Sequence, residues 1–165
     1  MLPSYSNFSG KIHGGYILGL MDQVAFACAS RHSGHYCVTA SVNRVDFLHP
    51  IEVGELVILK SSVNYTGRTS MVIGVRVESE NIKTGEVKHC NSSYFTMVAK
   101  DNHNNNVPVP GLILNNEESV RRFVRSIHRQ AQSRQRNLSF RKENFRLDDY
   151  IDTLVHQNAK VEIAI

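Results

Sequence analysis

The feature that most limits how this chain can fold is an apolar segment that directly follows Gly14-Gly15 and reads YILGLMDQVAFACAS. It is too long for a typical strand and long enough for a helix of several turns. Apolar residues would occupy nearly every face of that helix, and such a helix is normally buried. Arg31 and His32 suit its C-terminal end, where cations meet the helix dipole, and Gly34 is a typical stop. The segment therefore predicts a long central helix.

Four runs with the composition of β-strands follow this helix. They cover residues 37–48, 55–66, 70–81 and 87–101, and short turns such as Thr84-Gly85 separate them. Long strands joined by short turns indicate an antiparallel sheet. One sheet wrapped around one helix accounts for this order, so we predict an α+β fold. The helix can bury only one face of the sheet, so we expect the other face to need a partner or the C-terminal helix.

The C-terminal third differs from the rest of the chain. After the loop DNHNNNVPVP, a second helix is predicted from about Glu117 to Gln135. Its apolar positions at helical spacing are Val120, Phe123, Val124, Ile127 and Ala131. A short helix is expected over 149–156 and a strand over 161–165. We predict one domain over residues 1–112 and a basic helical extension over 113–165.

Charge and cysteine content limit the ligands, metals and cellular compartments that we expect for this protein. The 165 residues carry 19 Lys and Arg against 15 Asp and Glu, a formal charge of +4, and much of the excess falls between Arg121 and Arg146. This surplus suits an anionic ligand but does not by itself indicate nucleic-acid binding. The three cysteines form no metal-binding spacing, which predicts no metal and buried thiols in a reducing compartment. We recognise no signal peptide or membrane span, so we expect a cytoplasmic protein without membrane insertion.

Asp22 is the one carboxylate within the apolar helix. Burying a lone carboxylate is expensive unless it is paired or protonated. Asp22 therefore either occupies an exposed or hydrogen-bonded position, or serves as a catalytic carboxylate with a perturbed pKa. The residues alone leave both interpretations open.

The residues before the helix offer further candidates. Gly14-Gly15 either forms a plain turn or allows close approach of a ligand to free N–H groups, which stabilise an oxyanion. Asn7 alone is most simply a turn residue, and His13 is a capping residue or a base. Asp22 is about 10 Å along the helix axis from Gly15, which is long for one helix acting alone.

The turn Thr66-Gly67-Arg68-Thr69-Ser70 is either an ordinary hairpin or a phosphate contact, with Arg68 as the charged partner. It is not a P-loop. The chain has no GxSxG, HExxH or GxGxxG motif that would indicate a serine hydrolase, a zinc protease or a dinucleotide site.

Several segments in order resemble the acyl-CoA hydrolases of the hotdog superfamily, a fold in which an antiparallel sheet wraps around a long central helix. The segments are NFSGKIHGGYILGLMDQVAFACASRH, VTASVNRVDFLHPIEVGELVILKSSVNYTGRTSM, YFTMVAKD and VPVP. The resemblance is to bacterial single-domain enzymes and to the brain-type and cytosolic enzymes of animals. It covers roughly residues 5 to 112.

The resemblance implies hydrolysis of acyl-CoA to fatty acid and coenzyme A. It implies that Asn7 and Asp22 are catalytic, that Gly14 and Gly15 polarise the thioester carbonyl, and that residues 66–70 contact coenzyme A. It further implies a homodimer with shared sites in a trimer of dimers, and no cofactor beyond the coenzyme A of the substrate. Gln23 follows Asp22 where many members have Glu, and the basic C-terminal extension is unusual.

Two alternatives follow from the same residues. A hotdog dehydratase or hydratase would pair His13 with Asp22 on an acyl thioester. A non-catalytic acyl-CoA-binding protein, or an RNA-associated protein, would use the basic tail SIHRQAQSRQRNLSFRKENFR. We expect no nucleic-acid partner, because basic runs of this kind are usually solvated surface.

Overall fold

The structure, a computed structural model, describes residues 1–139, 146 and 149. The elements in chain order are η1 (Pro3–Tyr5), α1 (Gly14–Ser33), β1 (Tyr36–Val42), β2 (Asp46–Phe47), β3 (Leu56–Thr66), β4 (Ser70–Glu80), β5 (Val87–Lys100) and α2 (Glu117–Ser139). A first compact unit covers Met1–Ser126, and the remainder of α2 belongs to a second unit that starts at Ile127. The two predicted helices and the strand runs 55–66, 70–81 and 87–101 are confirmed, whereas the elements expected at 149–156 and 161–165 lie, apart from Asp149, outside the described residues. The domain boundary at 112/113 stays a prediction.

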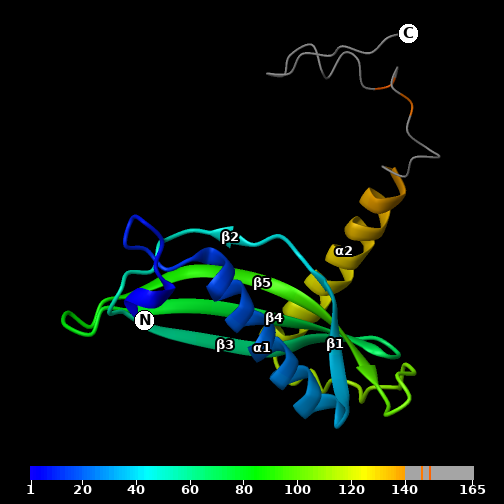
Figure 1. Ribbon diagram of the computed structural model, residues 1–165. Helices are drawn as coiled ribbons and strands as arrows, with labels where there is room; N and C mark the ends of the chain where they lie inside the picture. Colours follow the sequence, from blue (N-terminus) through cyan, green and yellow to red (C-terminus); the bar gives the residue numbers. More distant parts are fainter. Residues whose placement is uncertain (140–145, 147–148, 150–165) are drawn as a thin grey trace. The chain divides into compact units, whose positions relative to one another are not determined.

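The strands form one antiparallel sheet in the order β1-β5-β4-β3, with the short β2 also paired to β5 (Figure 1). The predicted run 37–48 is two strands rather than one. Asn43 leaves the ladder: its N–H donates to the Tyr94 carbonyl at 2.9 Å, and its carbonyl accepts from the Ser93 hydroxyl at 3.1 Å. This break lets β1 and β2 follow different parts of the same neighbour.

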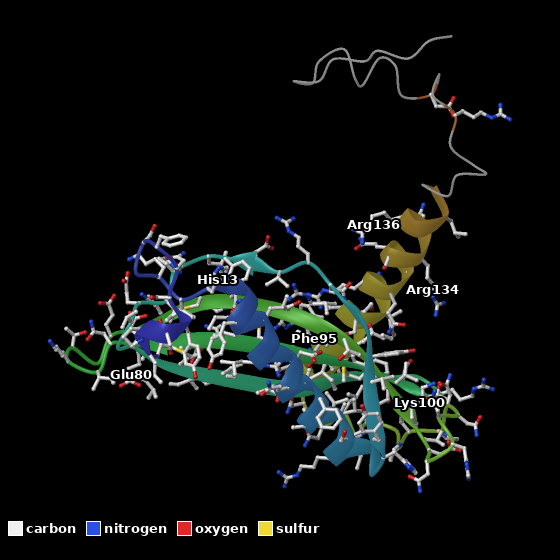
Figure 2. The ribbon with its side chains drawn as sticks, viewed as in Figure 1. His13, Glu80, Phe95, Lys100, Arg134 and Arg136 are labelled. Atoms are coloured by element: carbon white, nitrogen blue, oxygen red, sulfur yellow. The ribbon has the colours of Figure 1, made fainter. Side chains whose placement is uncertain are left out.

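The two ends of the sheet are marked by the last residues of β4 and β5. Glu80 closes β4 at one end, and Lys100 closes β5 at the other (Figure 2). Tyr36, the first residue of β1, pairs with Lys100, while Leu56, the first residue of β3, pairs with Glu80. We call these the Glu80 end and the Lys100 end.

Helix α1 crosses one face of the sheet and supplies one side of the core (Figure 1). Its buried residues Ile17, Met21, Ala25 and Ala29 repeat every fourth position, so they form one stripe. The facing strand residues alternate in the period of a half-buried strand. They include Met71, Ile73, Val75 and Val77 of β4 and Phe95, Met97 and Ala99 of β5. Gly34 ends the helix with a φ of 71°, as predicted.

The expectation that α1 is buried on all sides is wrong for this chain. Gly19, Gln23 and Ala27 are exposed, and Phe26 keeps 38% of its surface accessible. The sheet covers a single side of the helix, so the opposite apolar side has no cover from within the described part of the chain. That side is available to a partner subunit.

The other face of the sheet meets the first turns of α2. Phe123 packs on Tyr65 of β3, with ring centroids 5.0 Å apart, and Arg122 donates to the Ser62 hydroxyl at 3.3 Å. We predicted that a partner or the C-terminal helix covers this face, and the first turns of α2 do cover part of it.

Candidate active site

Residues Ser6–Ile12 form a closed loop immediately before α1. Ser6 and Ile12 form an antiparallel bridge, and Gly10 turns the chain with a φ of 73°. The Asn7 side-chain oxygen accepts hydrogen bonds from the N–H of Ser9 at 2.9 Å and of Lys11 at 3.1 Å. The Asn7 Nδ2 group has no partner among the described residues. The loop therefore fixes the amide through its oxygen and leaves its donor end available.

The loop is tied to the Glu80 end of the sheet by charged pairs. Lys11 forms an ion pair with Glu52, and the buried carboxylate of Glu55 lies 2.8 Å from the Lys88 ammonium. Burial alone would raise the pKa of Glu55, but the hydrogen bonds from Lys88 and from the Glu52 N–H hold that pKa below its usual value. Glu55 is thus charged at neutral pH and anchors the turn that receives the loop.

The start of α1 presents unpaired backbone donors. His13 is the N-cap and makes no side-chain cap, while its own N–H donates to the Tyr5 carbonyl at 2.8 Å. The N–H of Tyr16 reaches the His13 carbonyl at 3.0 Å. The N–H groups of Gly14 and Gly15 have no acceptor among the described residues. Unpaired donors at a helix N-terminus stabilise a negatively charged oxygen.

The two glycines differ in what surrounds them. A Cβ on Gly14 would lie 3.1 Å from the Phe47 ring, which would have to move slightly to admit it, so packing within the chain favours glycine there. A Cβ on Gly15 would meet no atom within 4 Å. Packing within the described chain therefore does not require a glycine at position 15, and the absent side chain leaves its N–H open to close approach.

A cavity of about 370 Å³ opens beside this helix start. Its accessible lining comes from Asn7, Lys11, Gly14, Phe47, Leu48 and His49, and Pro50 also contributes. Its buried lining comes from Ile12, Ile17, Ile51, Cys90 and Asn91. The cavity is thus polar and open where Asn7 and Gly14 stand, and mostly apolar further in, as is typical of sites for small organic ligands.

Asp22 is hydrogen-bonded rather than exposed or isolated. The Thr39 hydroxyl of β1 donates to its Oδ1 at 2.6 Å, and the same hydroxyl lies 3.4 Å from the Met97 sulfur. Asp22 is half-buried and does not line the cavity beside Gly14. Sequence analysis missed Thr39. A Thr in a strand run carries no sign of such a role, and the contact arises only from how β1 lies along α1.

Thr39 belongs to a cross-strand row that leads to the turn between β3 and β4. Successive partners along the row are Thr39, Met97, Met71 and Thr66. The turn is a tight hairpin, in which the Gly67 N–H donates to the Ser70 carbonyl at 2.8 Å, and the Arg68 carbonyl accepts from the Val109 N–H at 3.0 Å. The Arg68 side chain is exposed. Thr66–Ser70 therefore lies toward the same end of the sheet as Asp22 and Thr39.

The predicted site residues thus fall into two groups within one chain. Asn7, Gly14 and Gly15 meet at the Glu80 end, whereas Asp22 meets Thr39 on the side of the Lys100 end, with the turn 66–70. His13 and Asp22, which a dehydratase would pair, are separated by about 13 Å of helix axis and are not brought together. Neither group forms a complete hydrolytic site by itself.

The described part of the chain lacks the features of a metal site and of a membrane-spanning helix. No cluster of three or more His, Cys, Asp or Glu side chains is placed to hold a metal ion there. Among the same residues, no helix has the length and apolar character that a membrane crossing requires.

Comparison with protein-family models finds that residues 9–86 match the thioesterase superfamily. Protein VdlD of Helicobacter pylori is 42% identical over 129 residues, which span 78% of this chain and 74% of VdlD. YkhA of Bacillus subtilis, named an uncharacterized acyl-CoA thioester hydrolase, is 36% identical over 120 residues, or 73% of this chain and 70% of YkhA. The human cytosolic acyl coenzyme A thioester hydrolase is 32% identical over 123 residues, which span 73% of this chain and 32% of the human protein.

Solved structures of acyl-CoA thioesterases and hydrolases share the fold of this chain. An apo-hexameric acyl-CoA thioesterase matches with a TM-score of 0.81 and 37% identity over 86% of this chain and 90% of its own. Two variants of an acyl-CoA hydrolase from Staphylococcus aureus, one with an Asp and one with a Thr replaced by Ala, match with TM-scores of 0.78 and 0.77. Both are 26% identical over 84% of this chain, and the matches cover 85% and 86% of the respective variants.

Proposed function

This chain belongs to the thioesterase superfamily and has its hotdog fold, and we propose on that basis that it hydrolyses acyl-CoA to a free fatty acid and coenzyme A. The observation that carries the proposal is the pair of unpaired N–H groups at Gly14 and Gly15 beside the cavity that Asn7 lines. Such donors suit the oxygen that becomes negatively charged when a thioester carbonyl is attacked.

The reaction divides among the site residues as follows. The thioester carbonyl oxygen accepts hydrogen bonds from the N–H of Gly14 or Gly15, and Asn7 Nδ2 orients the carbonyl or the water. Asp22 removes a proton from water, whose oxygen bonds to the carbonyl carbon. The carbon–sulfur bond then breaks, and the coenzyme A thiolate takes up a proton. Attack by the Asp22 carboxylate itself, followed by hydrolysis of the anhydride, is the covalent form of the same proposal.

Thr39 acts as a positioning residue in this scheme. Its hydroxyl holds one carboxylate oxygen of Asp22 and leaves the other for the water or the substrate. The S. aureus variants support this pairing. The Asp and the Thr that were replaced in them are separated along that chain by the same number of residues as Asp22 and Thr39 are here.

The two half-sites are proposed to meet across a homodimer. Asp22 of one subunit would serve the helix start and Asn7 of its partner, because about 10 Å of helix axis separates Asp22 from its own Gly15. The uncovered apolar side of α1, including Phe26, gives such a dimer surface to bury. Hexameric relatives support a larger assembly of three dimers.

We also propose where coenzyme A binds and where in the cell the enzyme acts. Thr66–Ser70 contacts coenzyme A, with the exposed guanidinium of Arg68 on a phosphate. No separate cofactor takes part, because coenzyme A belongs to the substrate. The cytosolic name of the human relative supports action in the cytoplasm.

A coenzyme A release assay over acyl-CoA chains of increasing length tests the function. The wild-type protein should release thiol from at least one of them. Asp22→Ala should lose at least about 100-fold in kcat while keeping its assembly, whereas the control Glu86→Gln, in the exposed β4–β5 turn, should match the wild type. The proposal fails if no acyl-CoA is hydrolysed, and the role of Asp22 fails if Asp22→Ala stays active.

A further inference from the structure

Asn91 is a fully buried amide on the face of β5 that packs against α1. None of its surface is accessible. Its cross-strand partners are Val77 of β4 and Phe47 of β2, both apolar. An amide in such surroundings is normally hydrogen-bonded through both its oxygen and its nitrogen.

The hydrogen bonds of Asn91 are incomplete. Its Nδ2 donates to the Met21 sulfur at 3.6 Å, which is a weak acceptor, and its Oδ1 has no partner. The buried Asn64 differs, because its Oδ1 accepts from the Ser62 hydroxyl at 2.9 Å. A buried amide left in this state is rare, and binding of a ligand group is one function that would complete its hydrogen bonds.

The position of Asn91 indicates what that function is. Asn91 lines the cavity that opens beside Asn7 and Gly14. The other buried residues of the lining are Ile12, Ile17, Ile51 and Cys90, so the deep wall is apolar except at this amide. An acyl group attached to a thioester at Gly14 would extend into this cavity and toward Asn91, the one amide of its buried lining.

We infer that Asn91 determines specificity for the acyl group, selecting acyl chains that carry a hydroxyl group over saturated chains of equal length. This inference rests on the proposed thioesterase function. The hydroxyl donates to the unpaired Oδ1, and the amide of Asn91 thereby gains the partner that the chain does not supply. A plain hydrocarbon chain leaves the amide unpaired, and a site built to bond a hydroxyl discriminates against the analogue that lacks it.

The test compares kcat/KM for butyryl-CoA and hexanoyl-CoA with their derivatives hydroxylated at carbon 2, 3 or 4. The wild-type protein should prefer at least one hydroxylated substrate by about tenfold or more. Asn91→Leu, which has similar volume and no polar atom, should reverse or abolish that preference. Ser93→Ala is the control, because Ser93 is equally buried on β5, bonds the Asn43 carbonyl and is not part of the cavity lining.

The outcomes separate this inference from the proposed function. Hydrolysis of saturated acyl-CoA with no hydroxyl preference at any position overturns the role of Asn91 and leaves the thioesterase in place, and this result needs no variant. An unchanged preference in Asn91→Leu also overturns it, as does loss of all hydrolysis in a folded Asn91→Leu. Absence of hydrolysis of every substrate by the wild type overturns the function itself. Thermal unfolding and assembly size establish that the variant is folded.

Discussion

The Thr39 hydroxyl donates a 2.6 Å hydrogen bond to Oδ1 of Asp22, joining the first long strand of the sheet to the middle of α1. This bond fixes one oxygen of the only carboxylate in an otherwise apolar helical segment. The pair is the better-defined half of the proposed site, since both side chains are held by the fold before any substrate binds.

Thr39→Val should lower kcat by about tenfold, because Asp22 loses its orienting donor while the shape of the side chain is kept. KM should change less, since Thr39 touches the carboxylate and not the substrate. Steady-state kinetics over a range of acyl-CoA concentrations measures both values. Thr39→Ser restores the hydroxyl and should recover most of the activity. A purely structural role would instead lower the melting temperature of Thr39→Val and leave kcat of the folded fraction unchanged.

Sites shared between subunits predict complementation between two inactive variants. Asn7→Ala and Asp22→Ala should each be nearly inactive alone. In a mixed dimer one site carries both replacements and the other carries neither, so random mixing restores about a quarter of wild-type activity. Co-expression with two affinity tags, followed by the thiol release assay, measures this recovery. A site contained in one chain gives no recovery in the purified mixed dimer.

The two glycines at the helix start should respond differently to alanine. Gly15→Ala should fold at least as stably as the wild type, because no atom lies within 4 Å of the new Cβ and Ala favours a helix. Its activity should fall if substrate approaches the Gly15 N–H. Gly14→Ala should lose stability, because Phe47 must move. Thermal unfolding and kcat/KM of both variants test the contrast, and a fully active Gly15→Ala would remove Gly15 from the site.

Arg68→Ala should raise KM for acyl-CoA severalfold with little effect on kcat, because a phosphate contact far from the thioester contributes binding alone. The same acyl group on pantetheine, which lacks the nucleotide, should be hydrolysed equally by the variant and the wild type. Lys83→Ala, an exposed cation in the β4–β5 turn, is the matched control. Equal KM values for acyl-CoA in Arg68→Ala and wild type would contradict the contact.

The stability of the first turns of α2 should depend on pH in the acid range because of Glu118. The hydrogen bonds from Arg121 and Arg122 hold the pKa of Glu118 at about 2, below its ordinary value of 4.5. A lowered folded pKa gives stabilisation that is complete above pH 4.5 and is lost as pH falls toward 2. The protection of the amides in the first turns of α2, measured relative to their intrinsic exchange rates at each pH, should therefore decrease over that range in the wild type and much less in Glu118→Gln. Equal exchange profiles would show that the ion pairs contribute nothing.

The sequence predicted the long helix, its stop at Gly34 and the strand order along the chain, because apolar period and turn residues are local signals. It could not predict that Asn43 divides one strand run into two, since that break depends on hydrogen bonds to Ser93 and Tyr94 of a distant strand. The expected burial of α1 on every side was wrong for a related reason: composition shows that the segment is apolar, but not how many sides of the helix the sheet covers.

The candidate site also contains residues that local sequence predicts and residues that only the three-dimensional fold reveals. Asn7, the glycine pair and Asp22 stand out by sequence position and by resemblance to a family. Thr39 and Asn91 look like ordinary strand residues, and only register and burial give them roles. Cross-strand neighbours come from distant parts of the chain, so no local pattern records that Thr39 reaches Asp22.

Helix α1 also fixes the spacing of the two half-sites. It carries the donors of Gly14 and Gly15 at its start and Asp22 two turns later, on one rigid element. Inserting a single residue between them would rotate Asp22 by about 100° around the helix, away from Thr39, and shift it by about 1.5 Å. This part of the chain can therefore change by substitution but not in length without separating Asp22 from Thr39.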